Sequence, residues 1–168
     1  MHRLLNLFKP PSISGRETVK LTGEFTMRQW RDGKVIREFT KRNLIVNAGK
    51  ALAAGLLNGV SSGAFTYIAI GTSATAAAAT DVGLGAEITT GGIGRASATC
   101  TRVTTTVTDD TAQLVKTFEV TSAGPFAVVE SGVFNAASGV TMLCRQTFST
   151  VTLALNDKLE VTWKIAVS

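Results

Sequence analysis

The stretch KLEVTWKIAV, residues 158–167, decides the fold, because its apolar and polar residues alternate without a break. A period of two places successive side chains on opposite faces of a strand, so one face meets a core and the other meets water. This pattern predicts an antiparallel strand that is half buried. The residues predicted to face the core are Leu159, Val161, Trp163, Ile165 and Val167.

The same alternation opens the chain at residues 19–28, where Val19, Leu21, Phe25 and Met27 are predicted to share one face. Asp32-Gly33 follows, a strong signal for a two-residue hairpin turn, and a return strand is expected over residues 34–46. Eight or so strands at this spacing predict one antiparallel β-sandwich or jelly-roll-like domain over residues 19–168. The other predicted strands span residues 65–70, 95–108, 113–121, 126–134, 140–148 and 158–167.

One short helix interrupts the strands. Asn47 is expected to cap it, the sequence AGKALAAGLL follows, and Asn58-Gly59 ends it. Its leucines are predicted to lie on one face. Residues 72–80 form a low-complexity Ala/Thr loop, and residues 81–94 are expected to form an extended surface loop with room for one helical turn near residues 84–87.

Residues 1–18, MHRLLNLFKPPSISGRET, predict an arm rather than a regular element, because two prolines prevent a helix. The arm is too apolar to be a solvated tail, so we expect it to dock on its own domain or on a neighbour. The candidate partner-binding residues are Arg3, Leu4, Leu5, Leu7, Phe8, Lys9, Pro10, Arg16 and Lys20.

Charge is concentrated at the same end of the sequence. Residues 1–50 hold eleven Lys or Arg and four Asp or Glu, whereas residues 51–168 hold six and eight. A basic amino-terminal third favours an acidic partner, either a protein shell or a nucleic acid. A solvated basic strand pair without any partner accounts for the same charges.

The residue types of most enzymes are missing. His2 is the only histidine and lies in the arm, where it cannot hold the geometry of Ser–His or Cys–His catalysis. Cys100 and Cys144 lack a CxxC pair, so they indicate neither a zinc site nor a disulfide framework. We therefore expect no enzyme, no cofactor and no metal. No signal peptide or membrane span is recognised, which predicts a protein made in the cytoplasm.

Three stretches together resemble a class of tailed-phage structural proteins found among tail-fibre, collar and capsid-accessory proteins. The first is KRNLIVNAGKALAAGLLNG, residues 41–59, a strand that leads into a helix. The second is FTYIAIGTSATAAAATDVGLGAEI, residues 65–88, followed by Arg95. The third spans residues 128–168 and contains a Glu-x-Gly-x-Phe-Asn hairpin and a closing strand with a Trp.

Physical reasoning assigns structural roles to positions in these stretches. Gly132 permits a bulge or a close approach of backbone, and Phe134 and Trp163 fill core volume. Glu130 lies on an otherwise apolar strand, and a buried carboxylate needs a cation. We expect a structural pair with Arg95 or Arg145. A catalytic pair with Glu87, as in glycosidases, lacks an aromatic sugar platform.

The resemblance implies a virion structural protein, found in the host cytoplasm during assembly. The leading interpretation is a capsid decoration (cement) protein, with a trimer favoured, whose arm binds the major capsid protein or other virion subunits. The alternative is a tail, neck or collar/fibre-attachment component. A second alternative is a nucleic-acid-binding β-barrel with Trp30 as a stacking platform, although nucleic acid is the less expected partner. A glycan-binding role for the loop over residues 72–94 also stays open.

Overall fold

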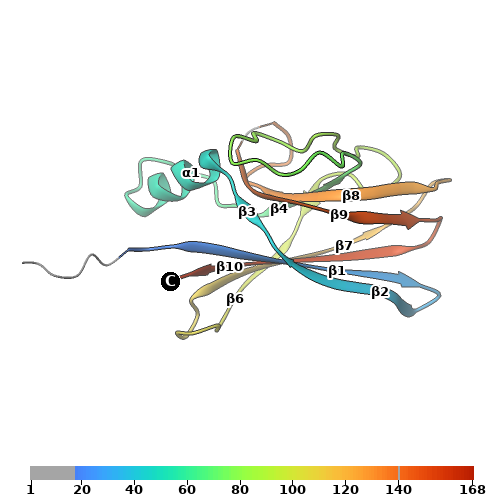
Figure 1. The fold of residues 1–168 in the computed structure, drawn as a ribbon, viewed down its shortest axis with the longest axis horizontal. Helices are drawn as coiled ribbons and strands as arrows, with labels where there is room; N and C mark the ends of the chain where they lie inside the picture. Colours follow the sequence, from blue (N-terminus) through green and yellow to red (C-terminus); the bar gives the residue numbers. More distant parts are fainter. Residues whose placement is uncertain (1–17, 140) are drawn as a thin grey trace, which may run out of the picture.

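The computed structural model describes residues 18–139 and 141–168, which form two antiparallel sheets packed face to face (Figure 1). The strand orders are β2-β1-β10-β7-β6 in one sheet and β3-β9-β8-β4-β5 in the other. The predicted mainly β sandwich with one short helix is confirmed. The strands are β1 (Leu21–Arg31), β2 (Lys34–Arg42), β3 (Leu44–Ile45), β4 (Tyr67–Gly71), β5 (Ala96–Ser97), β6 (Thr99–Val103), β7 (Thr111–Glu119), β8 (Phe126–Phe134), β9 (Met142–Leu153) and β10 (Lys158–Val167).

The opening hairpin forms as predicted. Asp32 and Gly33 have φ values of 50° and 72°, the left-handed conformations that a two-residue turn between twisted strands requires. Phe25 and Met27 are fully buried. Val19, predicted to share their face, is instead 74% exposed because it precedes β1 and the opposite sheet does not cover it.

The predicted return strand over residues 34–46 forms only as far as Arg42, because the chain changes sheets at Asn43. β2 pairs with β1, whereas β3 pairs with β9 of the other sheet. The turn at this point is possible because Gly23 has no side chain. A Cβ on Gly23 would collide with the Asn43 amide group, which fills that space.

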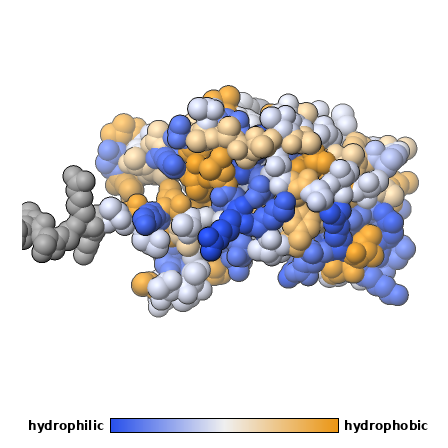
Figure 2. Space-filling view, in the orientation of Figure 1, coloured by the Kyte–Doolittle hydropathy of each residue, from blue (hydrophilic) through white to orange (hydrophobic). Residues whose placement is uncertain are grey.

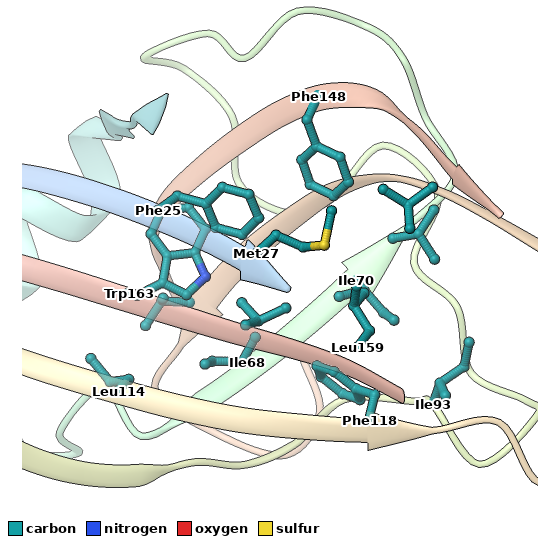
Figure 3. Close-up of a cluster of buried hydrophobic side chains, with 14 of the residues drawn as sticks. Phe25, Met27, Ile68, Ile70, Ile93, Leu114, Phe118, Phe148, Leu159 and Trp163 are labelled. Atoms are coloured by element: carbon teal, nitrogen blue, oxygen red, sulfur yellow. The ribbon is translucent and has the colours of Figure 1, made fainter. Parts of the chain in front are cut away.

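Aromatic side chains join the two sheets at the centre of the core (Figure 3). The Trp163 ring on β10 lies 4.9 Å from the ring of Phe25 on β1, measured between centroids. Phe25 in turn stacks at 5.1 Å on Phe148 of β9. Tilted and stacked pairs of this kind add to the free energy of simple area burial.

Helix α1 (Asn47–Leu57) packs through a glycine rather than through its leucines. Gly49 is its buried residue, and a Cβ there would lie 2.6 Å from Leu143 Cα on β9. The predicted Asn47 cap is also wrong, since Val46 is the N-cap and no side chain caps the helix. Leu57 is 87% exposed, so the predicted leucine face is not buried as a whole.

The connection between β4 and β5 folds back along β4, so residues 81–94 are not simply a surface loop. The backbone N–H of Ile88 donates to Ile70 O at 2.9 Å. Ile88 and Ile93 are buried in the main core. No helical turn forms at residues 84–87, because this segment makes strand-like hydrogen bonds instead.

Other boundaries move by a few residues. The strand predicted over residues 95–108 is divided into β5 and β6, which belong to different sheets. The strand predicted over residues 140–148 extends to Leu153, where it reaches the turn into β10. The division arises because β5 pairs with β4 whereas β6 pairs with β7, and β9 is long because its end pairs with the start of β8.

Candidate functional site

Lys20 is the one predicted partner-binding residue that the structure describes, and it is exposed. Its backbone exchanges two hydrogen bonds with Ser168, at 2.5 and 2.9 Å. The first described residues therefore lie beside the carboxyl terminus, at one end of the sandwich (Figure 1). The other predicted arm residues fall outside the described residues, namely Arg3, Leu4, Leu5, Leu7, Phe8, Lys9, Pro10 and Arg16.

We call this end the arm-bearing end; it comprises the start of β1, the end of β10, α1 with its following turn, and the β6–β7 connection (Figure 1). Each of these elements exposes a large apolar side chain. Figure 2 shows hydrophobic side chains gathered over α1. Large exposed apolar patches mark interaction surfaces; outside this end, Val35, Ile36, Val82 and Leu155 are exposed as well. The exposed apolar residues of the arm-bearing end are Val19, Leu57, Val60, Val107 and Val167.

A groove of about 790 Å³ opens at the same end. Its apolar wall is formed by Leu21, Leu44 and Ile45, and Lys50 and Lys164 lie on its rim. A volume of this size is in the range of sites that hold ligands or peptide segments. The arm-bearing end thus combines apolar surface, a concave site and positive charge.

A second cluster, the buried ion-pair cluster of Glu130, Arg145 and Asp81, lies under the β4–β5 connection. Glu130 is fully buried, and its carboxylate lies 2.8 Å from the Arg145 guanidinium. The same carboxylate accepts backbone hydrogen bonds from Ser73, Gly85 and Ala86 at 2.8–3.1 Å. This arrangement satisfies the charge and ties the long connection to the sheet.

Arg145 reaches further into the connection from its position on β9. It pairs with Asp81 at 2.8 Å and donates to Thr75 O at 2.9 Å. Burial alone would lower the pKa of Arg145, but the bonds to Asp81 and Glu130 outweigh burial and raise it. For Asp81, burial is opposed by hydrogen bonds from the Ala78 N–H and Arg145, which lower its pKa. Asp81 was not identified from the sequence, where it is one acidic residue at a loop boundary.

Arg95, the other cation considered for Glu130, has a different partner. It pairs with Glu87 at 2.5 Å, and its Cζ lies 3.6 Å from the ring centroid of Phe134. Its guanidinium also donates to Gly139 O at 2.9 Å. Arg95 therefore fixes the end of the connection against β8, and the two glutamates considered for catalysis pair with different arginines.

Gly132 is a site of close approach. A Cβ there would lie 3.0 Å from a Leu84 methyl group and 3.2 Å from Met142 Sδ. Register shifts occur on both sides of it, before Glu130 and after Val133, whereas Gly132 itself stays in register. The absence of a side chain lets Leu84 pack down onto β8.

Trp163 and Phe134, predicted to fill core volume, are 0% and 1% exposed. The Trp163 Nε1–H donates to Ser131 Oγ at 3.3 Å, and that hydroxyl donates to Ala69 O at 2.9 Å. The indole N–H of Trp163 and the hydroxyl of Ser131 therefore both have hydrogen-bond partners inside the core.

Part of the basic charge of the first hairpin is used within the domain. Arg28 pairs with Glu38 at 2.9 Å, and Arg31 pairs with Asp157 at 2.6 Å. They are two of the three cations near Trp30 in the sequence, and Trp30 is itself partly buried. The third, Lys34, forms no ion pair with a described residue, and neither do Arg37, Lys41 and Arg42 of β2.

Asp157 is a buried carboxylate that the sequence indicated only as part of a turn. It accepts hydrogen bonds from Arg31, from the Gln29 side chain and from the Ala154 N–H. The bonds from Arg31 contribute most to lowering its pKa to about 2, from an ordinary value of 3.8. This cluster fixes the β9–β10 turn against β1.

We expect this depressed pKa to make stability fall in acid. The contribution of Asp157 to the free energy of unfolding is complete above pH 4 and is lost as the pH falls towards 2. The reason is that protonation removes the negative charge of Asp157, which pairs with Arg31. Solvent around Arg31 screens the pair, so the loss amounts to about 1–2 kcal/mol. Urea unfolding of wild type and Asp157→Asn from pH 6 to pH 2 checks this. A difference between them that stays constant over that range would contradict it.

Cys100 and Cys144 are both free thiols, the first exposed on β6 and the second buried on β9. Burial raises the pKa of Cys144, and the neighbouring Asn43 amide opposes this in part. A buried thiol of raised pKa is chemically inert at neutral pH. Neither cysteine forms part of the two sites above.

Searches of protein-family models, curated proteins and solved structures found no match to this chain. Within residues 18–139 and 141–168, no group of three or more His, Cys, Asp or Glu side chains is placed to hold a metal ion. The helix in this part of the chain is too short to cross a membrane.

Proposed function

We propose that this chain is a structural protein of a tailed-phage virion, and specifically a capsid decoration protein. Its arm, residues 1–18, binds the shell, and the sandwich positions the arm. The alternative location, at the tail, neck or collar, uses the same attachment. The observation that carries the proposal is the convergence of the three phage-like stretches on one tertiary unit.

This convergence is visible in the sheet that contains β3, β9, β8 and β4. The first stretch supplies β3 and α1, the second supplies β4 and its connection, and the third supplies most of β8 and all of β9. The third stretch also supplies β10, which lies in the other sheet and packs across the core. The stretches also touch through side chains: Glu130 of the third holds the backbone of Gly85 and Ala86 in the second. Gly49 of the first packs on Leu143 of the third. The resemblance therefore covers residues that depend on one another physically.

The arm-bearing end supports attachment as the activity. An apolar and basic arm starts where the domain exposes Val19, Val167 and the end of α1. In an oligomer, several such arms would bind one shell together, and linked weak contacts add up to strong binding. A trimer is the form that we favour.

Deletion of residues 1–15 is expected to abolish binding to virion shells and to leave the domain folded, because residues 21–167 supply all the strands of the two sheets and the described core. Co-sedimentation with purified shells measures binding, and urea unfolding measures stability. The control is a chain with Arg3, Lys9 and Arg16 changed to Ala. It keeps the apolar residues of the arm, so it shows how much of the binding depends on charge and how much on apolar contacts. Undiminished binding by the deleted chain would overturn the assignment.

Copy number separates the two locations on the virion. A decoration protein is expected in amounts comparable with the shell subunit, whereas a neck or collar component is expected in one or two rings. Quantitative gels of purified virions measure this ratio.

A further inference from the structure

Because the chain changes sheets at Asn43, one strand edge at the arm-bearing end has no partner strand within residues 18–139 and 141–168. The ladder between β1 and β2 ends at the pair Glu24–Arg42, followed by one bond from Asn43 N–H to Gly23 O at 3.1 Å. Lys20, just before β1, uses its backbone N–H and C=O on the opposite edge, where both bond to Ser168, just after β10. Because backbone groups alternate in direction along an antiparallel strand, those of Leu21 face the edge that β2 has left.

The groove runs along this open edge. Leu21, Gly23 and Asn43 line it, together with Leu44 and Ile45 as they cross to the other sheet. The Asn43 amide is buried beside the Cys144 thiol, which is a weak partner, and neither its Oδ1 nor its Nδ2 makes a hydrogen bond of good geometry with a described residue. Leaving a buried amide without a good partner lowers the stability of the fold. Such groups are uncommon in native proteins and are tolerated more often at functional sites.

The charges around the groove favour an acidic occupant. Arg42, Lys50 and Lys164 line it, against Glu24 as the one carboxylate in the lining. None of the three cations forms an ion pair with a described residue, although Glu24 lies opposite both Arg42 and Lys164 in the strand register. The basic arm of this chain, or of a second copy, would be repelled here.

We propose that the groove receives an extended acidic segment of another protein subunit, which adds as a strand beside Leu21. The open backbone supplies hydrogen bonds, the apolar wall accepts alternate side chains, and the cations meet the acidic side chains between them. The inference rests on the proposed function only in taking that subunit to belong to the virion. It gives the domain a second contact, distinct from the arm.

The test uses two synthetic peptides and the full chain labelled with ¹⁵N. The acidic peptide is Thr-Val-Glu-Val-Glu-Val-Thr with blocked ends, and its partner has Lys in place of Glu. We expect the acidic peptide alone to shift the amide resonances of Leu21, Asn43 and Lys50 and to slow hydrogen exchange of the Leu21 amide. Lys50→Glu should weaken this binding about tenfold, corresponding to about 1.4 kcal/mol. The matched control, Lys34→Glu at the β1–β2 turn, should leave it unchanged.

Three results would overturn the proposal. These are equal binding of the two peptides, shifts confined to other surfaces, and equal weakening by Lys50→Glu and Lys34→Glu. Tighter binding of a single-stranded oligonucleotide at the same resonances would assign the groove to nucleic acid instead. Failure here is distinguishable from failure of the attachment role, because deletion of residues 1–15 leaves the groove intact.

Discussion

Glu130→Gln should destabilise the domain by about 3 kcal/mol, near the lower end of the cost of breaking a buried ion pair. Gln keeps the size of the side chain and one acceptor oxygen, so part of the backbone network with Ser73, Gly85 and Ala86 survives. The charge is lost, however, and Arg145 then remains buried with Asp81 as its acidic partner. Urea unfolding measures the change, and hydrogen exchange at the three amides shows whether the connection opens.

Glu38→Gln is the matched control. It removes one carboxylate from the Arg28–Glu38 pair, in which the side chains are 43% and 46% exposed. Solvent screens an exposed pair, so this variant should stay close to wild type in stability. The double variant Glu130→Gln with Arg145→Met should cost less than the sum of its single changes, because each change alone leaves a charge without its partner. Similar costs for Glu130→Gln and Glu38→Gln would refute the role of the buried cluster.

Trp163→Ala should cost about 3–5 kcal/mol, because it empties the largest fully buried side chain of the core. The cavity would face Phe25 and Ile68, which belong to different sheets. The two sheets would thus lose a contact that joins them, and the unfolding midpoint should fall accordingly. If this variant does not fold, Trp163→Phe provides a smaller change whose stability can still be measured.

Trp30→Ala provides a control of the same residue type on the neighbouring strand β1. Trp30 is only partly buried, so its truncation should cost less than about 1 kcal/mol. Comparable costs at the two positions would contradict the arrangement in which the core depends on Trp163.

Local sequence pattern determined the class of the fold. Alternation over residues 158–167 defined the bounds of β10, because that strand is central in its sheet and its core face is buried from Leu159 to Ile165. Val167, also predicted to face the core, is instead 48% exposed at the end of the strand. The turn at Asp32-Gly33 could be predicted because the required backbone conformation is a property of those two residues. Glu130 could be recognised as needing a cation, since a carboxylate in an apolar strand has few other ways to be buried.

The tertiary structure decided which residues meet. Arg145 rather than Arg95 reaches Glu130, because β9 pairs directly with β8 whereas Arg95 follows the connection to Glu87. The exit of β2 at Asn43, and with it the open edge and the groove, depends on contact between Gly23 and a side chain twenty residues later. Period and propensity act over a few neighbouring residues, so the sequence alone indicated most of the strands. How the two sheets pack decided where the strands predicted over residues 34–46 and 95–108 change sheets, and which residues meet in the sites between the strands.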